Sequence, residues 1–303
     1  MSDLPGQPTL DQLRVLIAVV ESGGLAAAGR RLGRATSAIS YAIAQLEGQL
    51  GLALFDRHAT RRPRLTEAGQ VVLAEARSVA GSIDGLRAKV KGLLDGLEPE
   101  LSFVVDALLP AERLVAALAA FQVAFPTVTL RLHVETLGAV GQLVRDGTAT
   151  LGVAGTMHSA PEGMMFQAIA GVRMVPVAAP GHPLARGRTA PGAAAAHVQL
   201  VLSDRSAVTA GKDFYVLGSR SWRIADLGTK HRLLLAGVGW GGMPEALVRD
   251  DLAAGRLVRL SLPDWADAHY RMALLHRVDT PPGPAARWLM ARFLAEPQRS
   301  AAA

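Results

Sequence analysis

The chain of 303 residues contains no cysteine, which excludes disulfide bonds, thiol nucleophiles and cysteine-ligated metals and is compatible with a reducing cytoplasm. Aromatic residues make up only 5% of it and charged residues 19%, whereas 50% is hydrophobic, a balance typical of a folded globular protein. No segment approaches the roughly 18 uninterrupted apolar residues of a membrane helix, and the first residues lack the basic and apolar run of a signal peptide. We therefore expect a cytoplasmic protein, and the chain length predicts two to three domains.

Lysine is scarce as well, because only four of the 32 basic residues are lysines. The net charge is +6, and most of it lies in one short segment: residues 28–66 hold seven arginines and only two acidic residues, Glu47 and Asp56. A positive charge concentrated in this way is typical of a surface that faces phosphates. The charge distribution therefore indicates an N-terminal segment that binds nucleic acid.

Three short helices are predicted near the N-terminus, over residues 9–21, 25–32 and 36–50. Thr9 and Gln12 form a capping-box pattern at the start of the first helix, and apolar residues then recur at helical spacing. Glycines follow each of the three helices, at the position where a helix commonly ends. Because two of these short helices are joined by a tight turn that contains a glycine, the pattern predicts a helix-turn-helix.

A small hairpin with a basic tip, here called the wing, is predicted over residues 52–65. Its apolar ends are Phe55 and Leu65, and it carries four arginines: Arg57, Arg61, Arg62 and Arg64. These side chains are expected to contact the DNA backbone or the minor groove, and to supply affinity more than sequence choice. Solvation or an internal ion pair is the alternative for each of them, above all for Arg57, which follows Asp56.

A long helix without proline is predicted over residues 67–97. Its apolar residues follow alternating steps of four and three, the heptad pattern of a helix that pairs with another helix. This seam comprises Val72, Ala76, Val79, Ile83, Leu86, Val90, Leu93 and Leu97. The alternative is a single helix that lies on its own domain.

Beyond a polar break at residues 98–100, short apolar runs alternate with helical segments, which is typical of βαβ units around a mainly parallel sheet. Strands are predicted near residues 101–106, 128–134, 151–154, 172–179, 198–203, 214–224, 257–262 and 270–277. Helices are predicted near residues 111–124, 137–146, 227–236, 244–254 and 284–295. The glycine-rich residues 237–242 are interpreted as a turn rather than a phosphate-binding loop, because they follow a helix and lack the P-loop and dinucleotide-binding spacings.

The N-terminal 70 residues resemble the LysR-type transcriptional regulators, because several elements of that family's pattern occur in order. They are Ala27-Ala28 to Leu32, Ala38-Ile39-Ser40, Leu46-Glu47, Leu50-Gly51, Leu54-Phe55-Asp56-Arg57 and Leu65-Thr66-Glu67-Ala68-Gly69. The resemblance continues with less force at residues 121–126, 143–147, 182–185, 237–244 and 255–257, and so covers essentially the whole chain.

This resemblance implies an α/β protein with a winged helix-turn-helix DNA-binding domain at residues 1–66 and a linker and dimerisation helix at 67–97. It implies a regulatory domain like a periplasmic binding protein at 98–303, built from two Rossmann-like subdomains. Subdomain I is expected at about 98–170 and 269–296, and subdomain II at about 171–268. The resemblance further implies a homo-oligomer, a dimer or a tetramer, on an inverted-repeat operator of double-stranded DNA, with a small-molecule effector between the subdomains.

The helix over residues 36–50 is the candidate for recognition in the major groove. Its outward polar residues can reach base edges or phosphates, and its N-terminus favours a phosphate. The candidate DNA-binding residues in and before this helix are Arg34, Thr36, Ser37, Ser40, Tyr41 and Gln45. Exposed polar residues on an ordinary surface helix are the alternative.

The candidate effector site lies where the predicted strands end, as in α/β folds generally. The matching positions are Leu108, Pro110, Thr136, Leu202, Ser203, Arg205, Gly239 and Trp240. Ser203 and Thr136 offer hydrogen bonds, Arg205 offers a partner for an anion and Trp240 offers a stacking face, so an aromatic or anionic effector is expected. Ordinary capping or packing is the alternative for each residue.

We expect no enzymatic activity, no cofactor and no metal, because the histidines are scattered and lack the spacing of zinc sites. Two rival functions remain. A solute-binding protein would share the sensor fold but would have no use for residues 9–66. A hydrolase with Ser203, Asp226 and His231 as a triad is the other, although no nucleophile-elbow glycines surround Ser203.

Overall fold

The computed structural model describes residues 7–56, 63–155, 163–187, 189–203, 206, 215–218, 220–265 and 268–295. The chain divides into two compact units, residues 1–91 and 92–303. Among the residues that the structure describes, no single helix is long and apolar enough to cross a membrane; α1 and α2 (below) reach that length only together, across a bend of 117°.

The first unit begins with three short helices, α1 (Leu10–Ser22), α2 (Leu25–Leu32) and α3 (Thr36–Leu50). The Thr9 side chain accepts a hydrogen bond from the backbone of Gln12, whose own side chain accepts one from the Thr9 backbone, so the predicted capping box is confirmed. Gly23, Gly33 and Gly51 end the three helices in the left-handed conformation that favours glycine. The predicted boundaries therefore hold to within one residue.

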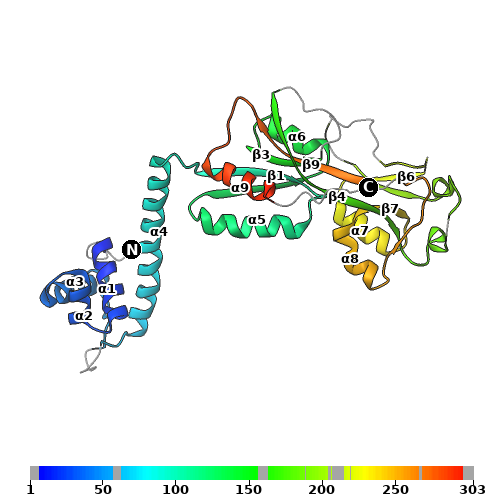
Figure 1. Ribbon diagram of the computed structural model, residues 1–303. Coiled ribbons are helices and arrows are strands. Elements are labelled where there is room, and N and C mark those ends of the chain that lie inside the picture. The colour runs from blue at the N-terminus through cyan, green and yellow to red at the C-terminus, as the bar shows by residue number, and fades with distance from the viewer. Residues whose placement is uncertain are drawn as a thin grey trace, which may run out of the picture. The chain divides into compact units, whose positions relative to one another are not determined.

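A fourth helix, α4 (Glu67–Leu94), is attached to the first unit through its N-terminal half (Figure 1). Leu73 and Ala76 are buried in the same apolar core as Leu16 of α1 and Ile39 of α3. Gly69 also lies in this half, and a Cβ atom there would collide with the Leu54 carbonyl oxygen. The close approach of helix and wing thus requires glycine.

The second unit combines a sheet with five longer helices in its described residues. The helices are α5 (Ala111–Ala124), α6 (Gly138–Arg145), α7 (Leu227–Leu235), α8 (Glu245–Ala253) and α9 (Pro284–Leu294), with two short 3-10 turns at Pro183–Ala185 and Ala193–Ala196. The strands are β1 (Glu100–Asp106), β2 (Thr129–Glu135), β3 (Leu151–Gly155), β4 (Met164–Ala178), β5 (Gln199–Leu202), β6 (Ser221–Ile224), β7 (Trp240–Pro244), β8 (Val258–Arg259) and β9 (Ala268–Arg277).

The strands form one hydrogen-bonded sheet in the order β2-β1-β3-β9-β4-β7-β5-β6, and β8 pairs with β4. Within each half the pairs are parallel: β1 with β2 and β3, and β5 with β6 and β7. The long strands β4 and β9 run antiparallel to each other and to their neighbours, and they connect the two halves. The predicted parallel pairing therefore holds inside each half, and the sheet as a whole is mixed.

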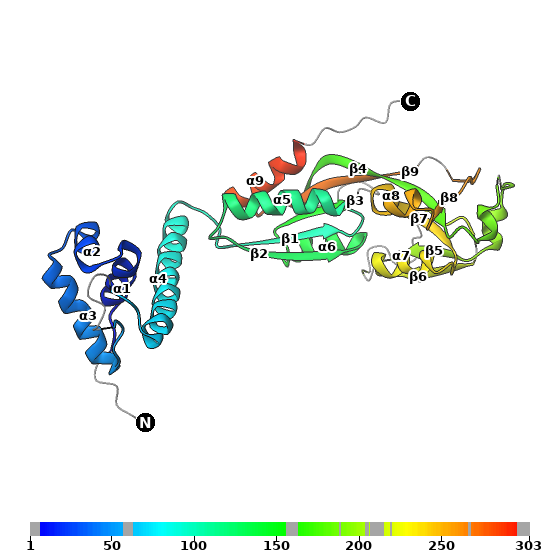
Figure 2. The ribbon, with the colours of Figure 1, turned by 90° about the horizontal axis from the view of Figure 1, so that it is seen from below.

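Helices cover both faces of the first half of the sheet (Figures 1 and 2). Phe103 of β1 packs on the side of α5 and α9, in a core shared with Phe121 and Phe293. Val104, the next residue, points to the opposite face and packs against Val140 and Val144 of α6. This alternation along a strand that is buried on both faces explains why Phe103, Val104 and Val105 follow one another as apolar residues in the sequence.

Three predicted strands and one predicted turn differ from the structure. The strand predicted at 172–179 begins much earlier, at Met164, and passes a bulge between Ile169 and Val172. The strands predicted at 214–224 and 257–262 shrink to β6 and β8. The predicted turn at 237–242 is wrong beyond its first residues: Gly237 turns the chain, but β7 starts at Trp240.

Candidate functional site

One face of α3 carries all the predicted recognition residues. Ile39, Ile43 and Leu46 point into the core. The opposite face exposes the side chains of Thr36, Ser37, Ser40, Tyr41 and Gln45, and the Tyr41 side chain is strongly exposed for an aromatic residue, at 66%. The structure therefore brings these five together on one exposed, polar surface.

The N-terminus of α3 has no side-chain cap, because Ala35 occupies the capping position. Its first backbone N–H groups consequently keep their capacity to bind an anion. The turn before it is kept short by Gly29, where a Cβ atom would lie 2.8 Å from the carbonyl oxygen of Arg34. Arg34 itself forms a two-pronged ion pair with Asp11 (2.7 and 2.9 Å), which raises the arginine pKa.

The base of the wing is a single antiparallel bridge between Phe55 and Leu65. The Glu47 carboxylate fixes it to α3, because it accepts hydrogen bonds from the backbone N–H groups of Leu54 (2.7 Å) and Phe55 (3.2 Å). Arg64 is exposed beside this bridge. The other wing arginines named from the sequence, Arg57, Arg61 and Arg62, lie outside the described residues.

The second half of α4 exposes an apolar stripe. Val79, Leu86, Val90 and Leu93 are all positions of the predicted heptad seam, and each is between 44% and 57% exposed. The start of the same seam differs, because Ala76 is buried in the core that α4 shares with α1 and α3. The N-terminal half of the helix thus lies on its own domain, as the alternative interpretation expected. The exposed stripe is compatible with the predicted helix pairing, which stays a prediction.

In the second unit, the Asp106 side chain at the end of β1 forms hydrogen bonds with several separate segments of the chain. Its fully buried carboxylate accepts hydrogen bonds from the Tyr270 hydroxyl (2.6 Å) and from the backbone of Leu108 (2.9 Å), Leu137 and Gly155. Burial raises the pKa of this carboxyl to about 6, although the hydrogen bonds act in the opposite direction. Leu137 adopts a positive φ of 51°, which is uncommon for leucine, so the carboxylate holds a strained residue in place.

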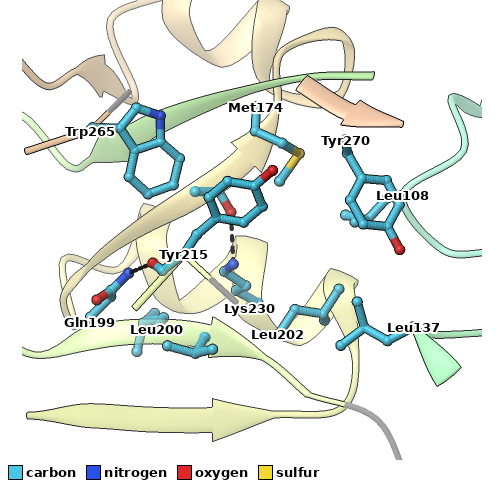
Figure 3. A pocket seen from close by; sticks show the side chains of 12 residues that line it. Leu108, Leu137, Met174, Gln199, Leu200, Leu202, Tyr215, Lys230, Trp265 and Tyr270 are labelled. Carbon is cyan, nitrogen blue, oxygen red and sulfur yellow. Dashed lines mark hydrogen bonds between the residues drawn. The ribbon is translucent and has the colours of Figure 1, made fainter. Parts of the chain in front are cut away.

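A pocket opens beside this group, at the carboxyl ends of β1, β2 and β5. Leu108, Leu137 and Tyr270 contribute walls from the first half of the sheet, and Leu202 and Lys230 are among those from the second (Figure 3). None of its twelve described lining residues is acidic. This is the place in an open α/β sheet where small ligands commonly bind.

Three aromatic and polar side chains give the pocket its shape. The Tyr215 ring stands in the middle of it and stacks on Trp265, with ring centroids 5.7 Å apart (Figure 3). Gln199 holds Tyr215 there, because its side-chain amide donates to the Tyr215 carbonyl oxygen (2.6 Å) and accepts from the backbone N–H of Leu217 (2.9 Å). The free space among the walls is consequently only about 40 Å³, room for about one or two water molecules.

Lys230, on α7, was not among the residues singled out from the sequence. Its side chain is buried and donates a hydrogen bond from Nζ to the Gly242 carbonyl oxygen (2.7 Å), and burial lowers its pKa to about 7. The glycines of β7 make room for it: a Cβ atom at Gly241 would lie 3.2 Å from the Lys230 Cε. The sequence did contain a signal for this residue: a lysine lies four residues after the capping Asp226, and a glycine-rich segment that can make room for its side chain follows.

The predicted effector residues fall into separate groups. Leu108 and Leu202 line the pocket. Thr136 is buried and donates a hydrogen bond from its hydroxyl to the Ser203 carbonyl oxygen (3.0 Å), which joins the two halves of the unit. Pro110 is the residue directly before α5. Arg205 lies outside the described residues.

Gly239 and Trp240 do not line this pocket. Trp240 is completely buried, and its indole N–H donates to the Ala194 carbonyl oxygen (3.3 Å), so its ring has no exposed face to offer a ligand. Gly239 packs against the backbone of Val198, the residue before β5. The stacking surface belongs instead to Trp265, which the sequence pattern did not distinguish from a core tryptophan.

Two of the three side chains of the hydrolase alternative, His231 and Asp226, form hydrogen bonds with other residues. His231 Nε2 lies 2.7 Å from an oxygen of Asp251, which also accepts a hydrogen bond from Arg256 (2.6 Å). Asp226 caps α7, because it accepts a hydrogen bond from the Thr229 backbone (2.6 Å). In the part of the chain that the structure describes, no group of three or more His, Asp or Glu side chains is placed to hold a metal ion.

Comparison with known proteins identifies two domains along the chain. Residues 10–70 match the model of the bacterial regulatory helix-turn-helix proteins of the lysR family, and residues 94–298 match that of the LysR substrate binding domain. The match at residues 10–70 is what a solute-binding protein alone would lack.

Relatives and solved structures extend over most of the chain. It is 31% identical to the HTH-type transcriptional activator AllS of Klebsiella pneumoniae over 255 residues, which is 82% of this chain and 93% of that protein. It is 32% identical over 212 residues to a probable hydrogen peroxide-inducible genes activator of Mycobacterium leprae, or 67% and 65% of the two chains. A full-length OxyR variant from Pseudomonas aeruginosa has the same fold, with a TM-score of 0.52 at 15% identity, covering 95% of this chain and all of that one.

Proposed function

The chain belongs to the LysR family of bacterial transcriptional regulators, and we propose that it binds an inverted-repeat operator as a dimer under the control of a small aromatic or anionic effector. The family consists of regulators that combine a helix-turn-helix DNA-binding domain with an effector-binding domain, and not of enzymes. We assign residues 1–66 to DNA binding, 67–97 to the linker helix and 98–303 to effector binding, with residues 98–170 and 269–296 as subdomain I and 171–268 as subdomain II.

The observation that carries the proposal is the exposed polar face at the start of α3. Hydroxyl and amide groups there match the hydrogen-bonding groups that base edges present in the major groove. Because Ala35 leaves the helix N-terminus uncapped, a DNA phosphate can take the place of the missing cap. We therefore assign base or phosphate contacts to Thr36, Ser37, Ser40, Tyr41 and Gln45.

The arginines divide into two roles. Arg34 is held by Asp11, so we assign it to fixing the turn, with a phosphate as a second partner. Arg64 is exposed at the base of the wing and is assigned to the DNA backbone together with Arg57, Arg61 and Arg62. Contacts of this kind supply affinity that weakens with salt.

We infer dimerisation from the exposed apolar stripe on the second half of α4. Two such helices that pair through Leu86 and Val90 would bury surface that the single chain leaves in water. A two-fold pair of wing domains then calls for two half-sites in inverted orientation. Pairing through the second unit would extend the dimer to a tetramer.

The effector is assigned to the pocket that Tyr215, Trp265 and Lys230 line. Relatives of the chain include proteins named as hydrogen peroxide-inducible genes activators. Peroxide sensing through a thiol needs cysteine, and none of the 303 residues is cysteine. The effector proposal therefore rests on the pocket and not on those names.

The test is fluorescence anisotropy of the purified full-length protein on a labelled duplex from immediately upstream of its own gene, with excess random DNA. We expect saturable binding by the wild type. The Ser40→Ala/Tyr41→Ala variant should bind the duplex with an affinity at least tenfold lower. If the upstream duplex shows no preference, selection from a genomic fragment library replaces it, and a library that yields no preferred site contradicts the proposal.

A matched pair of charge variants separates the wing from general electrostatics. Arg64→Ala and Arg77→Ala each remove one exposed arginine from the first unit, but only Arg64 lies in the wing. The slope of log K against log salt is negative, and each lost phosphate contact makes it less steep by about 0.9. We expect this change for Arg64→Ala and an unchanged slope for Arg77→Ala.

A further inference from the structure

Lys230 is an ionisable group buried in a pocket without an acidic partner. Its side chain is 4% exposed, and Nζ donates one hydrogen bond, to the Gly242 carbonyl oxygen (2.7 Å). An ammonium group has three donors, so two have no partner among the described residues. A buried charge is costly unless it is paired, and the described walls of the pocket supply no carboxylate.

The position of Lys230 in its helix adds to this cost. It lies in the first turn of α7, close to the positive end of the helix dipole, where a cation is disfavoured and an anion is favoured. Asp226 is the carboxylate nearest in sequence, but it accepts a hydrogen bond from the backbone N–H of Thr229 as the cap of α7. The local electrostatics therefore favour an anion beside Nζ.

The remaining walls favour a flat apolar body. Trp265 offers a ring face, on which Tyr215 now stacks at an interplanar angle of 30°. Most of the other lining side chains are apolar as well: Leu108, Leu137, Met174, Leu200, Val201 and Leu202 (Figure 3). Tyr215 adopts a positive φ of 59°, a conformation that is uncommon outside glycine, and it is kept there by Gln199. Its ring thus marks a place that accepts an aromatic ring.

We propose that the effector is an aromatic carboxylate, whose carboxylate pairs with Nζ of Lys230 and whose ring stacks on Trp265 in the place of the Tyr215 ring. The inference rests on the proposed function and specifies the chemistry of its effector. The carboxylate neutralises the buried ammonium, and the ring replaces a stacking contact that the protein already makes. An uncharged aromatic compound of the same shape would satisfy the second requirement but not the first.

The test compares acids with their amides by isothermal titration calorimetry on the full-length protein at pH 7.0. The probes are benzoate, phenylacetate and 1-naphthoate, each beside its carboxamide, which has the same shape without the charge. We expect at least one acid to bind at least tenfold more tightly than its amide. If no acid in the panel binds more tightly than its amide, the proposal is overturned, and this comparison needs no variant.

Two variants locate the effect on Lys230. Lys230→Met keeps the length and apolar stem of the side chain, and we expect it to abolish the preference for the acid. Arg232→Met removes a charge from the exposed side of the same helix and should leave the preference intact. If Lys230→Met remains folded by circular dichroism and still prefers the acid, the pairing is refuted.

Binding of operator DNA without any ligand separates this proposal from the one on which it rests. Wild-type protein that binds the operator but prefers no acid retains the regulator function and loses the carboxylate assignment. Protein that selects no DNA site but prefers the acid through Lys230 has the ligand site without the regulator function, and so supports the carboxylate assignment while contradicting the DNA proposal.

Discussion

Substituting Asp106 by asparagine should change how the stability of the second unit depends on pH. Burial raises the pKa of this carboxyl from 3.8 to about 6 in the folded chain. Between these two values the folded chain binds more protons than the unfolded chain, so the carboxyl makes the free energy of unfolding fall as the pH rises. Asparagine has the same shape but does not titrate, so the variant lacks this contribution.

The magnitude follows from the two pKa values. Linkage gives a contribution of about −1 kcal/mol to the free energy of unfolding at pH 4.5 and about −3 kcal/mol at pH 7.5, relative to strongly acid solution. The free energy of unfolding of wild type minus that of Asp106→Asn should therefore fall by about 2 kcal/mol over this range, and it can change sign. A lost hydrogen bond to the buried backbone or to Tyr270 also destabilises the variant, by about 1–3 kcal/mol, but equally at all pH values.

The assay is urea unfolding at pH 4.5, 6.0 and 7.5, followed by tryptophan fluorescence. All four tryptophans lie between residues 222 and 288, so the signal reports on the second unit alone. Asp250→Asn, at an exposed position of α8, is the control for a removed charge. If the free energy of unfolding of wild type minus that of Asp106→Asn stays constant with pH, or rises as the pH rises, the assignment of a buried carboxyl that titrates near pH 6 is refuted.

Two further predictions concern self-association and ligand binding. Leu86→Glu/Val90→Glu should convert the dimer to a monomer in sedimentation velocity, because both side chains lie on the exposed stripe of α4; Leu94→Glu, which is 83% exposed but outside the seam, should not. Acid binding should weaken up to tenfold per unit as the pH rises from 7 to 9, since the buried Lys230, with a pKa of about 7, must be charged to pair with the carboxylate. Asp106, behind Tyr270, is already ionised over this range, and an unchanged affinity would contradict the pairing.

The exposed polar face of α3, the proposed DNA-binding surface, could be predicted largely from the sequence because its determinants are local. The Thr9 capping box, the glycines that end the helices and the apolar spacing of α3 each act within a few residues. They fix which side of α3 is buried, and hence which polar residues are exposed. The pairing of Arg34 with Asp11 could not be predicted, because 23 residues separate the two.

The ligand pocket could be predicted only as a region. Strand ends near Leu108 and Leu202 follow from the βαβ pattern, but the pocket also depends on Tyr215, Lys230 and Trp265, which come from separate loops and from α7. The glycines before Met243 suggested a turn, since glycine is usually a poor strand former. In the structure Gly241 and Gly242 form a strand, because the Lys230 stem and the Trp265 ring occupy the space of their missing side chains.

Control of DNA binding by the effector requires a ligand that distinguishes two arrangements of the second unit. The position of the pocket suits this requirement, because Lys230 on α7 follows β6 of one half of the sheet, while Leu108 and Leu137 follow β1 and β2 of the other half. A carboxylate held by Lys230 would stabilise the arrangement in which both halves contact the ring. By thermodynamic linkage, an acid that changes operator affinity tenfold must have its own affinity changed tenfold by the operator, a coupling of about 1.4 kcal/mol. The acid affinity is measured with and without operator, and the operator affinity with and without acid. Unequal factors would show that the acid acts on another equilibrium, such as self-association.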